Sequence, residues 1–322
     1  MDGEVVLTTV STVRPASCKE GARAVLLNEI DHVLWRVGYF KRILIYKTHD
    51  SINIQFSDVF DKLKSSLSQA LVYFHPFAGR VRVRDDDSLL ELICNDDGVQ
   101  FVEASTDSDL NAIKDFQPSS FFSKLAQTPG CDPKWPWKAE YPLLFVQVTA
   151  FRSGGFSVGV TFSHQIADGP TIWHFLRSWA EIAPGENISQ HPQFMYKSLV
   201  KRSQTCSRKE PLSLYSVVKS RKDTMDVCID DHLHCKLFHI TKKTIHELKI
   251  STAQCVDARP FTTYEVITAH IGQRVTIARD IADEKPCRLF VLVNLRTDLQ
   301  ESRSITVAME HSTPLPSPLL VS

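Results

Sequence analysis

The sequence predicts an α/β protein with two domains, on three observations. The chain has 322 residues, a length that forms two domains more often than one. Strand-like runs, in which apolar and polar residues alternate, are followed by segments whose apolar residues recur every three or four positions. Residues 184–212 contain three prolines, one glycine and a basic stretch, a composition typical of a linker. We therefore predict an N-terminal domain over residues 1–183, a crossover linker over 184–212 and a second domain over 213–322.

The clearest pattern lies between residues 142 and 183. The run 142–151 is rich in apolar and β-branched residues and is predicted to be a strand. Residues 153–155, Ser-Gly-Gly, are typical of a turn. In the run 156–163, apolar residues alternate with small ones, which predicts a second strand with one buried face. The two runs predict a hairpin, with His164 where its second strand ends.

A helix is predicted to follow this hairpin. Apolar side chains recur there at steps of three and four and so share one face: Ile172, Phe175, Leu176, Trp179 and Ile182. Pro170 suits the first turn of a helix, because its missing N–H would have no partner there. His164 and Asp168 thus lie on a short connection between a strand and a helix, a position where catalytic side chains are common.

The remaining elements are predicted from the same two periodicities. In the first domain we expect strands over residues 5–13, 79–83 and 89–94, a helix over 56–74 that Ser57 could cap, and a short strand or helix over 43–46. In the second domain, Thr262 and Glu265 have capping-box spacing before a helix over 263–279. Residues 289–295 form a nearly continuous apolar run, typical of a buried strand. The tail, residues 297–322, has little periodicity and is expected to be irregular and extended.

Charge and composition argue against several functions. Lys plus Arg and Asp plus Glu both number 37, and the pI is near 7.2, so no basic field favours a nucleic acid or a membrane as partner. The N-terminus does not resemble a signal peptide, and nowhere do 18 apolar residues run together. The eight cysteines are dispersed without a Cys-x-x-Cys pair, which favours reduced thiols in a cytoplasmic protein.

Five segments carry a resemblance to a known family. His164-Gln-Ile-Ala-Asp168-Gly169 resembles the His-x-x-x-Asp-Gly motif of the BAHD acyltransferases, plant enzymes that move an acyl group from coenzyme A to an alcohol or amine. Four more segments resemble family sequences in the family's order: 72–80 (its Tyr-x-Pro-Leu-Ala-Gly-Arg), 236–249 (a strand, then a helix), 261–270 (a long helix) and 293–296 (a strand). The resemblance implies a fold like that of chloramphenicol acetyltransferase, with mixed sheets flanked by helices in two domains.

The resemblance also implies a chemistry. Acyl transfer from a thioester needs a base that takes the proton of the incoming hydroxyl or amine, and neutral histidine titrates near the working pH. His164 would be this base. Because a thiol is already a good leaving group, no covalent enzyme intermediate is required. The family implies acyl-CoA as a co-substrate, a small-molecule acceptor, no bound cofactor or metal, and a monomer.

Asp168 has two interpretations, and both are architectural. Aspartate favours the N-cap of a helix, here the helix that follows it. In the family, the matching aspartate pairs with an arginine, for which Arg296 in Asn294-Leu-Arg296 is the candidate. Gly169 is expected to let the backbone pass close to a neighbour.

Other residues that could carry chemistry have plainer interpretations. Cys228, His232, His234 and Cys235 are plausible zinc ligands, but their spacing fits no closed tetrahedral pattern, so we predict no metal. Trp173 and Trp179 are expected in the core. Three more histidines are expected to be packed or capping residues: His75, His174 and His270.

The sequence departs from the family after Arg296. The family's second signature, Asp-Phe-Gly-Trp-Gly, does not occur, so the resemblance predicts a C-terminally truncated member with an incomplete second domain. The strand at 289–295 would then be an unpaired edge unless the tail or another chain covers it. Two functions stay open: an active acyltransferase, or an inactive remnant that binds a ligand or partner. A hydrolase is a weaker third interpretation, because we expect no nucleophile turn of the Gly-x-Ser-x-Gly kind.

Overall fold

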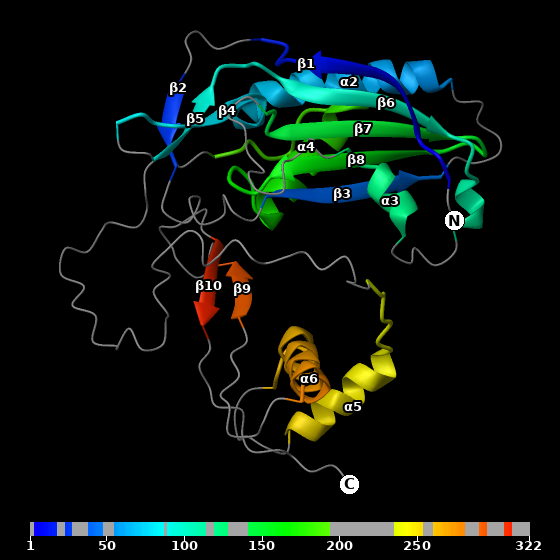
Figure 1. Ribbon diagram of the computed structural model, residues 1–322, viewed down its shortest axis with the longest axis vertical. Coiled ribbons are helices and arrows are strands. Elements are labelled where there is room, and N and C mark those ends of the chain that lie inside the picture. The colour runs from blue at the N-terminus through cyan, green and yellow to red at the C-terminus, as the bar shows by residue number, and fades with distance from the viewer. Residues whose placement is uncertain are drawn as a thin grey trace. The chain divides into compact units, whose positions relative to one another are not determined.

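The protein is described here from a computed structural model. The structure describes residues 3–17, 23–27, 38–47, 55–86, 89–113, 119–127, 141–193, 235–253, 260–280, 290–294 and 306–310. The chain divides into two compact units, residues 1–235 and residues 236–322, and Figure 1 shows the elements of both.

A five-stranded mixed sheet, of strand order β1-β6-β7-β8-β3, is the centre of the first unit (Figure 1). Its strands are β1 (Val6–Val13), β3 (Tyr39–Tyr46), β6 (Val99–Thr106), β7 (Leu144–Phe151) and β8 (Phe156–Ser163). Only the β6–β7 pair is parallel; β7 and β8 form the predicted antiparallel hairpin, and β8 also pairs antiparallel with β3. The strand alternative for residues 43–46 is therefore correct, and that strand begins at Tyr39.

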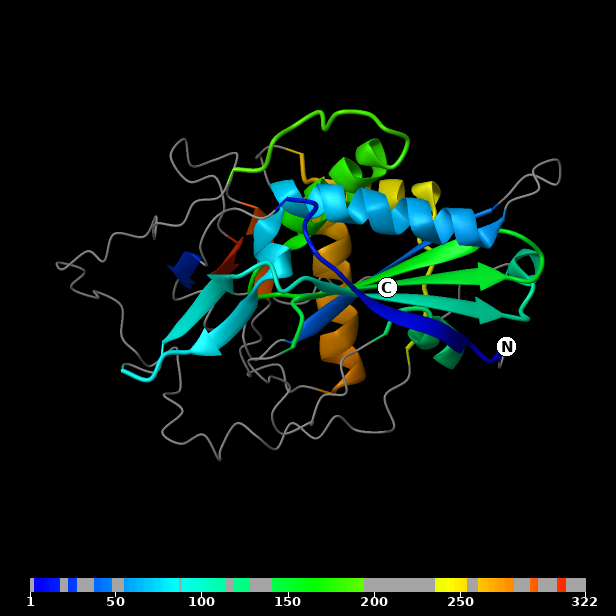
Figure 2. The same cartoon turned by 90° about the horizontal axis from the view of Figure 1, so that it is seen from above.

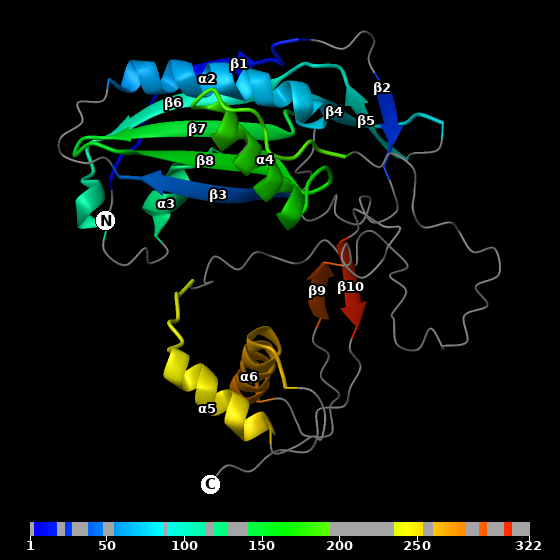
Figure 3. The same cartoon turned by 180° about the vertical axis from the view of Figure 1, so that it is seen from behind.

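Two helices cover one face of this sheet, and a shorter helix covers the other. Helix α2 (Phe56–Tyr73) and helix α4 (Gly169–Ile182) lie on the same face, in front of the sheet in Figure 3 and side by side in Figure 2. They bury the large core with side chains of alternate strand positions, among them Val146, Val160 and Phe162. On the opposite face, α3 (Ser120–Lys124) adds Phe121 to a second cluster with Leu110, Leu125 and Phe151.

A small antiparallel sheet of order β2-β5-β4 completes the first unit. Its strands are β2 (Arg23–Leu26), β4 (Arg80–Val83) and β5 (Leu90–Cys94), and the short helix η2 (His75–Ala78) joins α2 to β4. A further short helix, η3 (Leu110–Ala112), follows β6. Cys94 is buried beside Leu92, and this burial raises the pKa of its thiol to about 11, with a smaller contribution from Asp96. Such a thiol is inert rather than reactive.

The second unit contains two helices in contact and a pair of strands. Helix α5 spans Lys242–Ala253 and α6 spans Thr263–Ala278. The predicted capping box is confirmed: the Thr262 hydroxyl accepts from the Glu265 N–H at 3.2 Å, and the Glu265 carboxylate accepts from the Thr262 N–H at 2.7 Å. The strand expected after residue 236 is wrong, because residues 235–241 are in no strand.

The tail does not remain irregular throughout. Strand β10 (Thr306–Glu310) pairs antiparallel with β9 (Phe290–Asn294), opposing Thr306 to Asn294 and Glu310 to Phe290. The prediction of an irregular tail is therefore wrong at these residues. The tail itself covers one side of the strand that was expected to be an unpaired edge.

Two side chains at helix positions differ from expectation. Ser57 does not cap α2: the N-cap is Gln55, without a side-chain hydrogen bond, and the Ser57 hydroxyl donates to Asp58 at 3.3 Å. Trp173 is 52% exposed, whereas Trp179 is buried as predicted. The periodicity of α4 explains the difference, because Trp173 lies on the face turned away from the buried stripe.

No helix among the described ranges is long and apolar enough to span a bilayer.

The two helices of the large core are joined by one buried hydrogen bond, which gives a stability prediction. The Trp179 indole N–H donates to the Ser66 hydroxyl at 2.9 Å, and both residues are buried. Ser66→Ala leaves that N–H without a partner, so we expect it to lower the free energy of unfolding by about 1–2 kcal/mol. Denaturant unfolding measures it, with exposed Ser57→Ala as control, expected within about 0.5 kcal/mol of wild type. Equal effects of the two changes would contradict the prediction.

Candidate functional site

His164 is the first residue after β8, and backbone hydrogen bonds hold this point of the chain from both sides. Ser163 donates its N–H to the Leu143 carbonyl at 2.9 Å, directly before β7. His164 donates its N–H to the Gly38 carbonyl at 3.3 Å, directly before β3. The histidine backbone is thus fixed by both strands that flank β8 in the sheet.

The imidazole of His164 lies against an aromatic neighbour. Its centroid is 4.6 Å from that of the Phe40 ring, with 80° between the ring planes, which is an edge-to-face arrangement. Nδ1 is buried and has no hydrogen-bond partner among the described residues. The residue as a whole has intermediate exposure, so its accessible surface lies on atoms other than Nδ1. His164 is therefore not completely enclosed by the core.

Asp168 acts on helix α4. Its Oδ1 accepts hydrogen bonds from the Thr171 N–H at 3.0 Å and from the Thr171 hydroxyl at 2.6 Å, so Asp168 is the N-cap that one interpretation expects. Arg296, the partner that the other interpretation expects, lies outside the described residues. No carboxylate in the described ranges hydrogen-bonds Nδ1 of His164. The motif's aspartate thus caps helix α4.

The loop between the two motif residues is tied to the end of β8 by a polar pair that the sequence analysis did not single out. The Ser163 hydroxyl donates to Oε1 of Gln165 at 3.3 Å, and the Gln165 N–H donates to the Ser163 hydroxyl at 3.4 Å. Both residues are buried. Their spacing of two, around His164, is the only signal in the sequence that could have found them.

The close backbone approach expected at Gly169 is not observed. A Cβ built there meets no atom of the described chain within 4 Å. The close approach lies instead at Gly159 in β8, where a Cβ would come within 2.0 Å of the Leu125 carbonyl oxygen and 2.8 Å of Ala126 Cα. Gly159 is thus the residue that lets the segment after α3 pack on the sheet.

A Gly-x-Ser-x-Gly match does occur, at residues 155–159, contrary to expectation. Ser157, its central residue, lies inside β8 and is fully buried. A nucleophile elbow instead places its serine on a sharp, exposed turn between a strand and a helix. The match therefore does not form a nucleophile elbow, and it gives the hydrolase interpretation no support.

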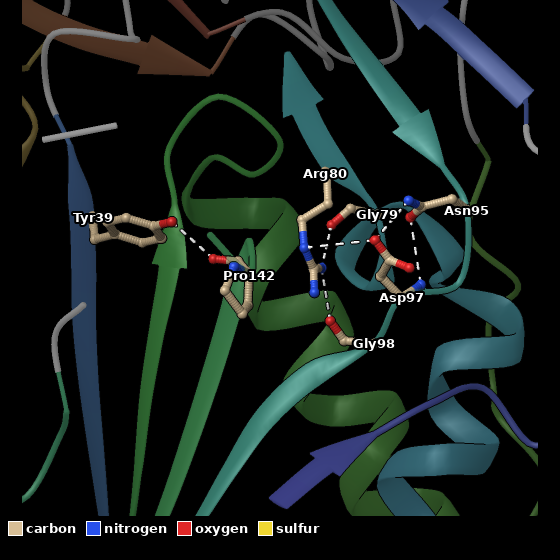
Figure 4. A network of polar contacts seen from close by, with 7 residues as sticks. All are labelled: Tyr39, Gly79, Arg80, Asn95, Asp97, Gly98 and Pro142. Carbon is tan, nitrogen blue, oxygen red and sulfur yellow. Dashed lines mark hydrogen bonds and ion pairs between the residues drawn. The ribbon is translucent and has the colours of Figure 1, made fainter. Parts of the chain in front are cut away.

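The first residue of β3 is fastened to the residues before β7. Tyr39 donates its hydroxyl to the Pro142 carbonyl at 2.8 Å (Figure 4), and its ring meets Phe145 edge to face at 5.6 Å. Because Tyr39 is also the register partner of Ser163, this contact stiffens the end of the sheet from which His164 emerges.

Arg80, the last residue of the segment 72–80, has a structural role (Figure 4). Its Nη1 donates to the carbonyls of Gly79 at 2.7 Å and Gly98 at 2.8 Å, and its Nε lies 3.9 Å from Asp97. Burial lowers the pKa of this guanidinium, and the Asp97 charge opposes that change. Arg80 thus ties the start of β4 to the turn before β6.

The other candidates do not form a second site within the described residues. Nε2 of His174 lies 2.9 Å from the Gln190 carbonyl, a packing contact of the expected kind. Cys228, His232 and His234 lie outside the described residues, and Cys235 is an exposed free thiol. Where the structure describes the chain, no three His, Cys, Asp or Glu side chains come together as a metal would require.

Solved structures share the mixed α/β fold of this chain. Vinorine synthase matches with a TM-score of 0.65 and 23% identity, over 95% of this chain and 71% of that one. TRI101 of F. graminearum, complexed with coenzyme A and T-2 mycotoxin, matches with a TM-score of 0.62 and 14% identity, over 90% and 69%. The fold is therefore α/β and of the chloramphenicol-acetyltransferase kind, as the resemblance implied.

Sequence comparisons give the family. The sequence model of the Transferase family matches residues 4–307. Hydroxycinnamoyltransferase of Narcissus pseudonarcissus is 33% identical over 76% of this chain and 56% of its own length. Anthranilate N-benzoyltransferase protein 1 of Dianthus caryophyllus is 31% identical over 88% of this chain and 64% of its own length. The chain belongs to this Transferase family, the BAHD acyltransferases, and it spans less than two thirds of the length of these relatives.

The cap at Asp168 gives a prediction that separates stability from chemistry. Asp168→Ala removes the acceptor of two hydrogen bonds at the start of α4, so we expect the free energy of unfolding to fall by about 1 kcal/mol. Asp168→Asn keeps a good N-cap and is expected to retain most of that stability. Thermal unfolding measures both variants. Unchanged stability together with lost activity in Asp168→Ala would contradict an architectural role.

Gly159 and Gly169 form a matched pair for testing the packing of β8. Gly159→Ala forces the Leu125–Ala126 backbone away from the sheet, and we expect a loss of about 1–3 kcal/mol or more. Gly169→Ala adds a methyl group in open space at the start of a helix, and its effect is expected within about 0.5 kcal/mol. Thermal unfolding of both variants gives the comparison; a Gly169→Ala loss as large as that of Gly159→Ala would contradict it.

Proposed function

We propose that this chain is an acyltransferase that moves an acyl group from acyl-CoA to a hydroxyl or amine of a small-molecule acceptor, with His164 as the general base. The observation that carries the proposal is the placement of His164: it occupies the family motif at the end of β8, its backbone is fixed on both sides, and the residue is only half-buried. A fixed base with open surface is what proton transfer from an incoming nucleophile requires.

The reaction needs two proton transfers and no covalent enzyme intermediate. As the acceptor's oxygen or nitrogen attacks the thioester carbonyl, the neutral imidazole takes the acceptor's proton. When the carbonyl re-forms, the C–S bond breaks, and the proton passes to the leaving sulfur as free coenzyme A. One imidazole can carry out both transfers, so no carboxylate partner is required in principle.

The relatives suggest the first substrates to try. Similar proteins are named as hydroxycinnamoyl and N-benzoyl transferases, and one similar relative as a shikimate O-hydroxycinnamoyltransferase. Their names cover both oxygen and nitrogen acceptors. We therefore propose an aromatic acyl-CoA as donor and a small ring compound that carries a hydroxyl or an amino group as acceptor. The chain is proposed to act as a cytoplasmic monomer.

Turnover by the purified chain tests the proposal. Product from p-coumaroyl-CoA or benzoyl-CoA, with shikimate or anthranilate, is measured by chromatography and mass spectrometry. We expect His164→Gln to lower turnover by about 10²–10⁴-fold, the usual contribution of a general base.

His174→Gln is the matched control, because the same substitution is made at a half-buried histidine whose contact is to a backbone carbonyl. It is expected to keep turnover close to wild type. Binding of acyl-CoA without turnover, equal in wild type and His164→Gln, would favour the alternative of an inactive ligand-binding remnant.

A further inference from the structure

A catalytic base needs a neighbour that holds its ring in one orientation. In many such sites this neighbour is a polar group that hydrogen-bonds the second ring nitrogen. Here Nδ1 of His164 is buried without a hydrogen-bond partner in the described part of the chain. Asp168, the carboxylate of the motif, accepts hydrogen bonds from Thr171 at the start of α4. The contact that the described residues show on this ring is instead one of packing.

Phe40 is the aromatic side chain that packs on this ring. The two centroids are 4.6 Å apart and the ring planes meet at 80°. Edge-to-face contact at this distance is a favoured arrangement of aromatic rings, because the positive edge of one meets the negative face of the other. Rotation of the imidazole about its Cβ–Cγ bond would break this geometry, so the contact restricts that rotation.

Phe40 is itself held by the sheet and by the core. It lies opposite Phe162 in the β3–β8 register, and the two rings are 6.3 Å apart. Phe162 is 2% exposed, and Phe40 packs against the same large core. The hydrogen bond from the His164 N–H to the Gly38 carbonyl keeps β3 beside the histidine. Phe40 thus transmits the rigidity of the core to the imidazole.

We propose that Phe40 is the positioning residue of His164, holding the imidazole by edge-to-face contact where a carboxylate would otherwise hold it by a hydrogen bond. The catalytic part of this inference rests on the proposed function, whereas the effect on the ring does not.

The test compares Phe40→Leu with a control at the opposite end of the same strand pair. Phe156 also packs against the large core, and it stacks on Tyr46, its partner in the β3–β8 register, at 4.9 Å. Phe156→Leu thus removes a similar amount of aromatic packing from the same two strands, far along the register from His164. Phe40→Tyr keeps an aromatic ring and serves as the conservative variant.

Two readouts are used on the full chain. The ring resonances of His164 are followed by NMR with ¹³C-labelled histidine and assigned by their loss in His164→Gln. The values of kcat and KM are measured with p-coumaroyl-CoA or benzoyl-CoA. For Phe40→Leu we expect shifted His164 resonances, a kcat about tenfold lower and a KM within about twofold of wild type, because misplacing a catalytic group acts on the chemical step. Phe40→Tyr is expected to restore kcat, and Phe156→Leu to change neither readout.

The outcomes separate the inference from the function on which it rests. The inference about Phe40 is overturned if the His164 resonances are unchanged in Phe40→Leu, or if Phe40→Leu and Phe156→Leu lose kcat equally. In either case, an inactive His164→Gln still supports the proposed function. Wild-type turnover in His164→Gln overturns the proposed function and, with it, the catalytic role of Phe40.

Discussion

The pairing of β8 on both sides is the constraint on which this structure depends. Antiparallel ladders join β8 to β7 and to β3, so the strand can shift only if both ladders break. Alternate residues of β8 face opposite sides of the sheet. Val158, Val160 and Phe162 pack in the large core on one side, and Gly159 leaves room for Leu125 on the other. A slip of one residue would exchange the two sets. The register therefore fixes where the strand ends and, with it, the position of His164.

The motif around this strand end divides its work between chemistry and architecture. His164 is half-buried with the Phe40 ring beside its imidazole, and Asp168 caps the helix that follows. On either side of His164, Ser163 and Gln165 hydrogen-bond each other and so tie the loop to the end of β8. The aspartate of the motif thus starts helix α4 by accepting the N–H of Thr171.

Local patterns predicted the parts of the fold that depend on near neighbours in the sequence. The β7–β8 hairpin, helix α4 and the Thr262–Glu265 capping box each arise from residues a few positions apart, and all three were predicted. The parallel pairing of β6 with β7 joins residues 45 positions apart, such as Gln100 and Phe145, through backbone hydrogen bonds, which side-chain periodicity does not encode. The same holds for the contact between Phe40 and His164, which exists only once β3 lies beside β8. Trp173 was placed in the core because of its residue type, although the period of α4 puts it on the exposed face.

The central claim is that the imidazole of His164 stands where a thioester and its acceptor meet. A crystal structure with a non-reactive thioether analogue of p-coumaroyl-CoA tests this claim most directly. The account predicts the analogue's carbon next to sulfur within about 4 Å of the accessible face of that imidazole, the separation of groups poised to react. An analogue bound elsewhere on the protein, or an imidazole enclosed by side chains on every face, would contradict it.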